Sequence, residues 1–108
     1  MANTFKLKTK ANVGVTTTSV YVVPSATTTV VIGVTLANTT GSSINVGVGV
    51  TRASTDDVKL MKNVPIPQGS SFEFMAGNKV VLETTDTLTA ESDVNNSLDV
   101  ALTIMEIT

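Results

Sequence analysis

The sequence predicts a small all-β protein: a single β-sandwich, jelly-roll-like, with eight to nine mostly antiparallel strands. Three observations predict this fold. Threonine and valine, which are β-branched and suit a pleated sheet, supply nineteen and seventeen of the 108 residues. Apolar and polar side chains alternate with a period of two over long stretches. Turn-forming residues separate these stretches at regular intervals, which is typical of sandwiches and barrels.

The alternating stretches define the expected strands in chain order. The alternation is clearest over residues 30–36, 44–50 and 98–104, where Val, Ile and Leu occupy every second position and are expected to face inward. In the first of these stretches the inward series is Val30, Ile32, Val34 and Leu36. The expected strands are residues 4–9, 18–23, 29–38, 43–52, 57–62, 70–76, 79–84, 86–91 and 97–107.

The segments between the strands carry their own signals. Gly77-Asn78 lies between two apolar stretches, residues 72–75 and 79–82, and predicts a tight hairpin. Pro65 and Pro67 cannot donate to a sheet ladder, so their segment is expected to be a crossover or an edge. The last strand would extend over roughly 30 Å and is expected to be held in a sheet, either its own or a neighbour's.

The composition predicts one domain, residues 1–108, with an aliphatic core. Apolar residues make up 42% of the chain, which is enough for a core without metal or disulfide, but aromatic residues make up only 4%. The few large side chains expected to fill that core are Phe5, Phe72, Phe74 and Tyr21.

Charge is sparse and unevenly distributed. Charged residues are 15% of the chain, against the usual quarter, so hydroxyl, amide and glycine groups must cover much of the surface. Lys6, Lys8 and Lys10 make residues 1–10 a basic strand or arm, whereas the remainder is acidic. These lysines either dock the chain head to tail in an assembly or guard an edge strand against unwanted pairing.

Small residues lie opposite the apolar stripes at five strand positions: Gly33, Ala37, Gly47, Gly49 and Ala101. Glycine weakens a strand interior unless something approaches it closely. Two interpretations stay open, a smooth contact face for another subunit, or close packing and bulges within the sandwich. The interface candidates chosen on these grounds are Lys6, Lys8, Lys10, Gly47, Gly49, Met105 and Ile107.

The residue types argue against catalysis. The chain has no His and no Cys, which removes the imidazole base, the thiolate and the ordinary zinc ligands. Asp56-Asp57 and Glu91/Asp93 could offer carboxylates to calcium, but neither matches a calcium-binding loop, and acidic turns are favoured. A glycosidase carboxylate pair or a lysine base would need aromatic platforms, and Tyr21 is a poor one. We therefore expect no catalytic residue, no cofactor and no metal.

Nucleic acid and membrane partners are not expected either. One Arg and no basic stripe fall short of a nucleic-acid footprint. No apolar stretch reaches the roughly 18 residues of a membrane span, and the N-terminal segment lacks the apolar region of a signal peptide. Synthesis in a cytoplasm is the expectation.

Several segments taken in order resemble small β-rich virion structural proteins of tailed bacteriophages, especially marine and cyanobacterial ones. They are Phe5-Lys6 with Asn12-Val13-Gly14, Val20-Tyr21-Val22-Val23-Pro24, and residues 31–38, 65–71, 79–83 and 102–108. Each is ordinary strand-and-turn sequence, and the series carries the resemblance over nearly the whole chain. Where relatives typically have Tyr-Thr-Val-Pro, this chain has Val22 in place of Thr.

The resemblance implies a virion location and a non-enzymatic role. The preferred role is capsid decoration or cement that bridges capsid subunits, with a neck, collar or tail component as the alternative. Its partners would be capsid or other virion proteins and copies of itself, with a trimer favoured. A carbohydrate- or receptor-binding module is the alternative from another class, although it would need exposed aromatic residues or a metal loop.

Overall fold

The computed structural model describes residues 3–52, 57–74 and 80–108, and these form nine strands. No helix is present among them, hence none that could cross a membrane. The all-β prediction is confirmed. The strands are β1 (Asn3–Val13), β2 (Thr18–Val22), β3 (Thr28–Asn38), β4 (Ile44–Thr51), β5 (Asp57–Ile66), β6 (Ser71–Phe74), β7 (Val80–Leu82), β8 (Thr87–Ser92) and β9 (Leu98–Ile107).

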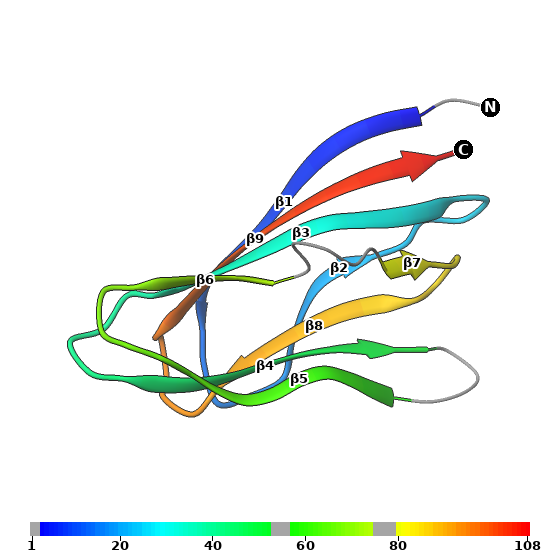
Figure 1. Cartoon of the computed structure of the whole chain (residues 1–108). Helices are drawn as coiled ribbons and strands as arrows, with labels where there is room; N and C mark the ends of the chain where they lie inside the picture. The colour runs from blue at the N-terminus through cyan, green and yellow to red at the C-terminus, as the bar shows by residue number, and fades with distance from the viewer. Residues whose placement is uncertain (1–2, 53–56, 75–79) are drawn as a thin grey trace.

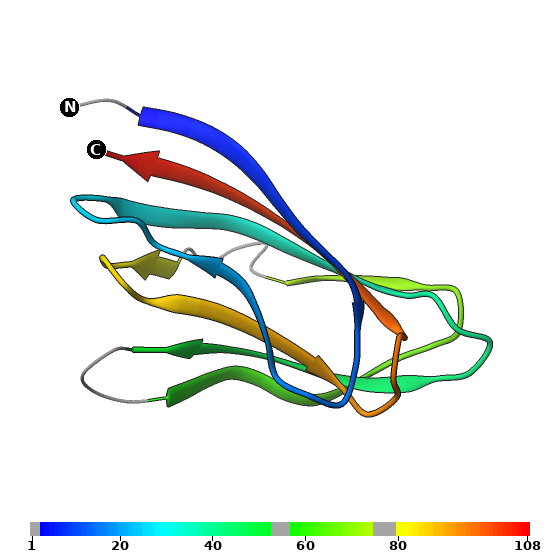
Figure 2. The same ribbon diagram turned by 180° about the vertical axis from the view of Figure 1, so that it is seen from behind.

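Two antiparallel sheets pack face to face (Figures 1 and 2). The first sheet has the order β1-β9-β3-β6, with β7 also paired to β3, and the second has the order β2-β8-β4-β5. The chain crosses repeatedly between the sheets, so strands that are neighbours in a sheet are mostly distant in sequence. When β6 and β7 are taken as two segments of one line along β3, this is the strand order of a jelly roll.

The core lies between the sheets and is aliphatic, as predicted. Leu36, Leu102 and Ile104 from the first sheet and Val48 and Leu88 from the second are almost fully buried. They occupy alternate positions of their strands, because successive side chains point to opposite faces of a sheet. Tyr21 is the buried aromatic residue of this core among the side chains that the structure describes.

The prediction that Phe5 fills the core is wrong. β1 pairs with β9 so that Phe5 lies opposite Met105 and Lys6 lies opposite the buried Ile104. Directly opposed residues share a face. Phe5 is therefore on the outside and 70% exposed, whereas the lysines take the inward positions of β1. Phe72 is also partly exposed, at 38%, on β6, and the side chain of Phe74 lies outside the described part.

The inward series predicted for β3 holds at Val34 and Leu36 but fails at Val30 and Ile32. The pairing of β3 with β9 shifts register between Val31 and Gly33. Such a bulge inserts one residue and reverses the alternation on one side of it. Thr29 and Val31 are consequently the fully buried residues of that half, and Val30 and Ile32 are only partly buried.

The predicted hairpin at Gly77-Asn78 is wrong in its strand pairing, although the two residues themselves lie outside the described part. β6 and β7 do not pair with each other. Both pair antiparallel with β3, β6 along residues 34–37 and β7 along residues 29–31. The two segments therefore run in the same direction beside one strand, whereas a hairpin would reverse the chain between them.

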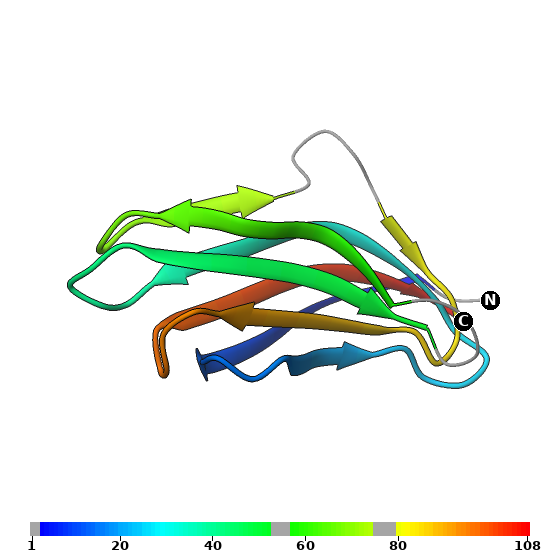
Figure 3. The ribbon, with the colours of Figure 1, turned by 90° about the horizontal axis from the view of Figure 1, so that it is seen from below.

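Two expectations about strand ends are confirmed. β9 lies between β1 and β3 in the chain's own first sheet. Pro65 lies in β5, an edge strand of the second sheet. An edge strand has a neighbour on one side alone, so a residue without a backbone N–H is tolerated there. Figure 3 shows β5 and β2 along the two edges of the second sheet.

Candidate contact surface

The outer face of the first sheet carries a row of apolar side chains across four strands. The strand register places Phe5 opposite Met105, Met105 opposite Val30, and Val30 opposite Val81. Residues opposed in this way lie on one face, and here it is the face turned away from the core. We call Phe5, Met105, Val30 and Val81 the apolar row.

Much of this row and its surroundings is open to solvent. Phe5 is 70% exposed and Val81 57% exposed, and Leu7, two residues along β1, is 65% exposed. Met105 and Val30 in the middle of the sheet are partly buried, as is Ile107 beside them on β9. Scattered exposed apolar residues need no explanation, but a contiguous exposed patch marks a binding surface.

Next to the apolar row the same face is lined by small side chains. Thr103 and Gly33 come first along the strands, followed by Ala101, Thr35 and Ala37. A Cβ atom added to Gly33 would meet nothing within 4 Å. We call these five residues the trough. A shallow hollow of about 240 Å³ lies over its far end, between β1, β9 and β3.

The charged residues of this face lie along the trough, where Glu73 is directly opposite Thr35. Among the described outward positions of this sheet, the charged residues are Asp99 on β9 and Glu73 on β6. Asp99 accepts a hydrogen bond from the backbone N–H of Asn12 at 3.0 Å. The apolar row and the adjoining part of the trough carry no described charge, so docking a flat apolar partner there requires no desolvation of an ion.

The inward side of β1 explains why Phe5 and Leu7 point outward. Lys6 Nζ lies 2.8 Å from the carboxylate of Glu106, which is only 5% exposed. The Tyr21 hydroxyl from the second sheet donates to the same carboxylate at 2.5 Å and lies 2.9 Å from Thr29 Oγ1. The ammonium of Lys8 is 6.0 Å from the centroid of the Tyr21 ring, within cation–π range.

This polar cluster shifts the pKa of two side chains, Glu106 and Tyr21. The Lys6 ammonium, and then the Tyr21 hydroxyl, hold the pKa of Glu106 below its ordinary value. Burial, and then the hydrogen bond to Glu106, raise the pKa of Tyr21 to about 12. The carboxylate and the phenol thus keep their ordinary ionisation at neutral pH. The cluster ties β1 and β9 to β2, and a flipped β1 would lose it.

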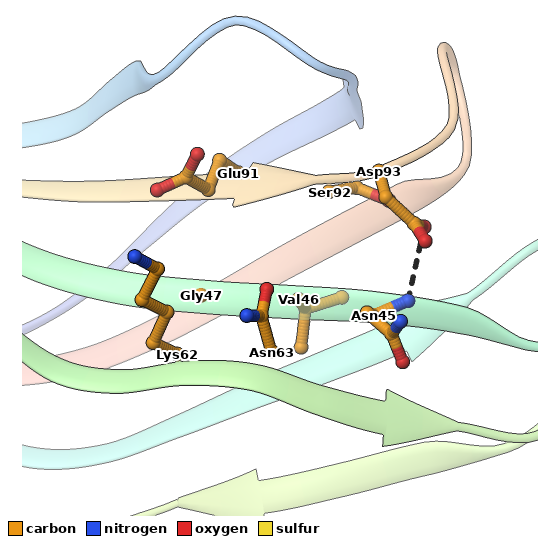
Figure 4. A pocket seen from close by; sticks show the side chains of 8 residues that line it. All are labelled: Asn45, Val46, Gly47, Lys62, Asn63, Glu91, Ser92 and Asp93. Carbon is orange, nitrogen blue, oxygen red and sulfur yellow. Dashed lines mark hydrogen bonds between the residues drawn. The ribbon is translucent and has the colours of Figure 1, made fainter.

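The outer face of the second sheet is different, because two of its carboxylates have partners within the chain. Lys59 on β5 and Glu91 on β8 are 2.7 Å apart across β4. Asp93 accepts a hydrogen bond from the backbone N–H of Asn45 at 3.0 Å. Asn45, Glu91 and Asp93, with Lys62 and others, surround a polar depression of about 110 Å³ (Figure 4).

The depression offers little chemistry. Each of its two carboxylates is already engaged, Glu91 by Lys59 and Asp93 by the Asn45 backbone. The described residues contain no group of three or more His, Cys, Asp or Glu that could hold a metal ion. Asp57 of the other acidic pair is exposed at the start of β5, and Asp56 lies outside the described part.

Gly47 and Gly49 are buried on this second face, and their own sheet explains them. A Cβ at Gly49 would lie 2.9 Å from the carbonyl oxygen of Val58, and one at Gly47 would lie 3.3 Å from that of Met61. The register between β4 and β5 also shifts on both sides of Val48. Close approach at bulges, the second interpretation offered above, is what the geometry supports here.

The seven interface candidates do not form one surface. Met105 and Ile107 lie beside Phe5 on the outer face of the first sheet. Lys6, Lys8 and Lys10 occupy the inward positions of β1, and Gly47 and Gly49 belong to the second sheet. The sequence did not lead us to expect Phe5, Leu7, Val30 and Val81 on a contact surface.

No family model and no curated protein matches this sequence. One solved structure that is similar to it is a protein of the Bacillus endospore appendages, described as a novel family of disulfide-linked pili. The similarity has a TM-score of 0.59 with 13% sequence identity, and it covers 99% of this chain and 87% of the other. At this identity the similarity shows that the two chains share a fold.

Proposed function

We propose that this chain is a non-enzymatic structural subunit of a large protein assembly, and that the assembly is a tailed-phage virion on which it decorates or cements the capsid. The observation that carries the proposal is the outer face of the first sheet. A row of four apolar side chains led by Phe5, 70% exposed, spans four strands. Such a face is suited to protein contact.

The fold is compatible with this role. The structural neighbour is a pilus protein, so this sandwich architecture occurs in a protein that works by assembly. That neighbour's family is disulfide-linked, whereas this sequence contains no cysteine. An assembly of this chain would therefore form without disulfides of its own, and an exposed apolar face offers a non-covalent contact. The virion itself rests on the sequence resemblance.

As a cement subunit, the chain would bridge neighbouring capsid proteins and bury apolar area that resists their separation. A neck, collar or tail location would use the same face with fewer copies. The number of copies in each purified particle separates these locations, since hundreds indicate the capsid and six to a few dozen indicate the neck or tail.

A second candidate is a self-assembling filament subunit, which the pilus neighbour favours. The two candidates differ in what they require. A filament subunit polymerises when purified alone, whereas a cement subunit needs the particle as its template. Electron microscopy of the concentrated pure protein would show filaments in the first case and none in the second.

Incorporation into particles tests the proposal. Particles are assembled with wild-type protein, with Phe5→Glu, and with the matched control Val22→Glu, which places the same charge at a 53% exposed valine on β2 of the second sheet. We expect wild type and the control to co-purify with particles and Phe5→Glu to be lost at least about tenfold. Absence of the wild-type protein from purified particles would contradict the virion role.

A further inference from the structure

We infer that the outer face of the first sheet binds a second copy of this chain, face to face, in a two-fold dimer. The inference rests on the proposed function, because the surface is the one assigned there to assembly. It adds the identity of one partner and the geometry of the contact. Three features of the face argue for it: its shape, its charge and its area.

The face has a raised part and a lowered part side by side. The apolar row is bulky and exposed, and the trough is built from Gly, Ala and Thr. Nothing lies within 4 Å of a Cβ placed on Gly33, and the hollow beyond it measures about 240 Å³. A benzene molecule fits a cavity of about 150 Å³. The hollow therefore has room for the ring of one Phe5.

A two-fold axis brings these complementary parts together. In a two-fold contact the same patch meets itself with its two ends exchanged. If the axis crosses the strands at the level of Leu7, Thr103 and Gly33, the apolar row of each copy lies over the trough of the other. Phe5 of one copy then meets Thr9 and Ala101 of its partner, and Leu7 meets Leu7 at the axis.

Charge and area are both compatible with this contact. The carboxylate of Asp99 would lie over the uncharged end of the partner's face, near Ile107, and that of Glu73 would lie near the partner's Val81 at the rim of the face, so no described carboxylate faces another. Strand spacing and rise give the face an area of about 600 Å². Two such faces bury about 1,200 Å² in total, the lower end of the range for specific interfaces.

Solution mass is the first test. Multi-angle light scattering over a dilution series should give twice the chain mass for wild type and for Val22→Glu. Phe5→Glu and Leu7→Glu should weaken the dimer at least about tenfold. A wild-type monomer at the highest soluble concentration would overturn the inference, and so would a stable trimer.

Cross-linking tests the geometry and serves as a second route if a charged variant fails to fold. The chain has no cysteine, so Leu7→Cys and Val22→Cys each introduce a single thiol. Packed sheets lie about 10 Å apart, which is too far for a direct disulfide, so a short bismaleimide is used. Leu7→Cys should give a covalent dimer. Equal dimer yields from the two variants would refute the arrangement.

The two proposals fail separately. A monomeric wild type that still needs Phe5 for incorporation into particles would keep the assembly role and refute the self-contact. A dimer that depends on Phe5 but is absent from particles would keep the self-contact and refute the virion role.

Discussion

The two sheets of the sandwich turn opposite kinds of surface to solvent. On the second sheet, Lys59 pairs with Glu91, and Asp93 accepts a hydrogen bond from the backbone N–H of Asn45, so these polar groups have partners within the chain. On the first sheet, Phe5 and Leu7 remain 70% and 65% exposed, and no described residue covers them.

This difference separates stability from association. Both sheets bury an aliphatic inner face, so both contribute to the core that stabilises the fold. Apolar area left in water contributes nothing to the stability of the monomer, but it contributes to binding when a partner covers it. We therefore expect substitutions on the inner faces to change unfolding and substitutions on the apolar row to change association.

The largest expected effect compares the two sides of β9. Leu102→Ala removes a fully buried side chain and should lower the free energy of unfolding by about 3 kcal/mol, since it leaves a cavity. Met105→Ala, on the outer side of the same strand, should cost less than about 1 kcal/mol. Urea unfolding of both variants at a concentration where the protein is monomeric measures this. Equal losses would erase the distinction between the faces.

The next effect concerns the cluster that orients β1. Glu106→Gln removes the charge that Lys6 faces and should cost about 1–2 kcal/mol at neutral pH. Because the pKa of Glu106 is lowered in the folded chain, its contribution to stability is present above its ordinary pKa of 4.5 and is lost as the pH falls.

The difference in unfolding free energy between wild type and Glu106→Gln should accordingly shrink as the pH is taken below 4.5. Chemical unfolding at several pH values measures it. A difference that stays constant with pH would mean that the carboxylate is not held ionised by its partners.

A pair of glycines compares the two outer faces directly. Gly49→Ala on the second sheet forces a Cβ to within 2.9 Å of the Val58 carbonyl and should cost about 1–2 kcal/mol. Gly33→Ala on the first sheet meets nothing within 4 Å and should be neutral or slightly stabilising. Thermal unfolding of the two monomeric variants measures the difference in stability. A larger loss of stability for Gly33→Ala than for Gly49→Ala would contradict the assignment of the second sheet's outer face as the more crowded one.

The smallest expected effect lies on the polar face. Lys59→Ala breaks an exposed pair with Glu91 and should cost under about 1 kcal/mol, less at high salt. It should leave association unchanged. A Lys59→Ala variant that no longer dimerises would move the contact surface to the second sheet.

Much of the fold follows from alternation that is visible in the sequence. Val48 and Leu102 are buried as the period of two predicts, and β9 is held in the chain's own sheet. The bulge at Ile32 was not predictable, because one inserted residue changes the facing without changing the composition. The turn signal at Gly77-Asn78 predicted that β6 and β7 pair with each other, whereas both pair with β3, which no local signal reveals.

The contact surface was harder to predict than the fold. In β1 an apolar series led by Phe5 alternates with a lysine series, and alternation alone does not state which series faces inward. The register with β9 decides it. One clue was present: Glu106 continues the inward series of Leu102 and Ile104, and a carboxylate at such a position needs a cation nearby. Lys6 is that cation.

A map of amide chemical shifts over a dilution series tests most directly whether the outer face of the first sheet is the contact surface. We predict that signals from Phe5, Leu7, Thr103 and Met105 move with concentration while those of Lys59, Glu91 and Asp93 stay fixed. Shifts confined to the second sheet, or no shifts at any concentration, would contradict the account.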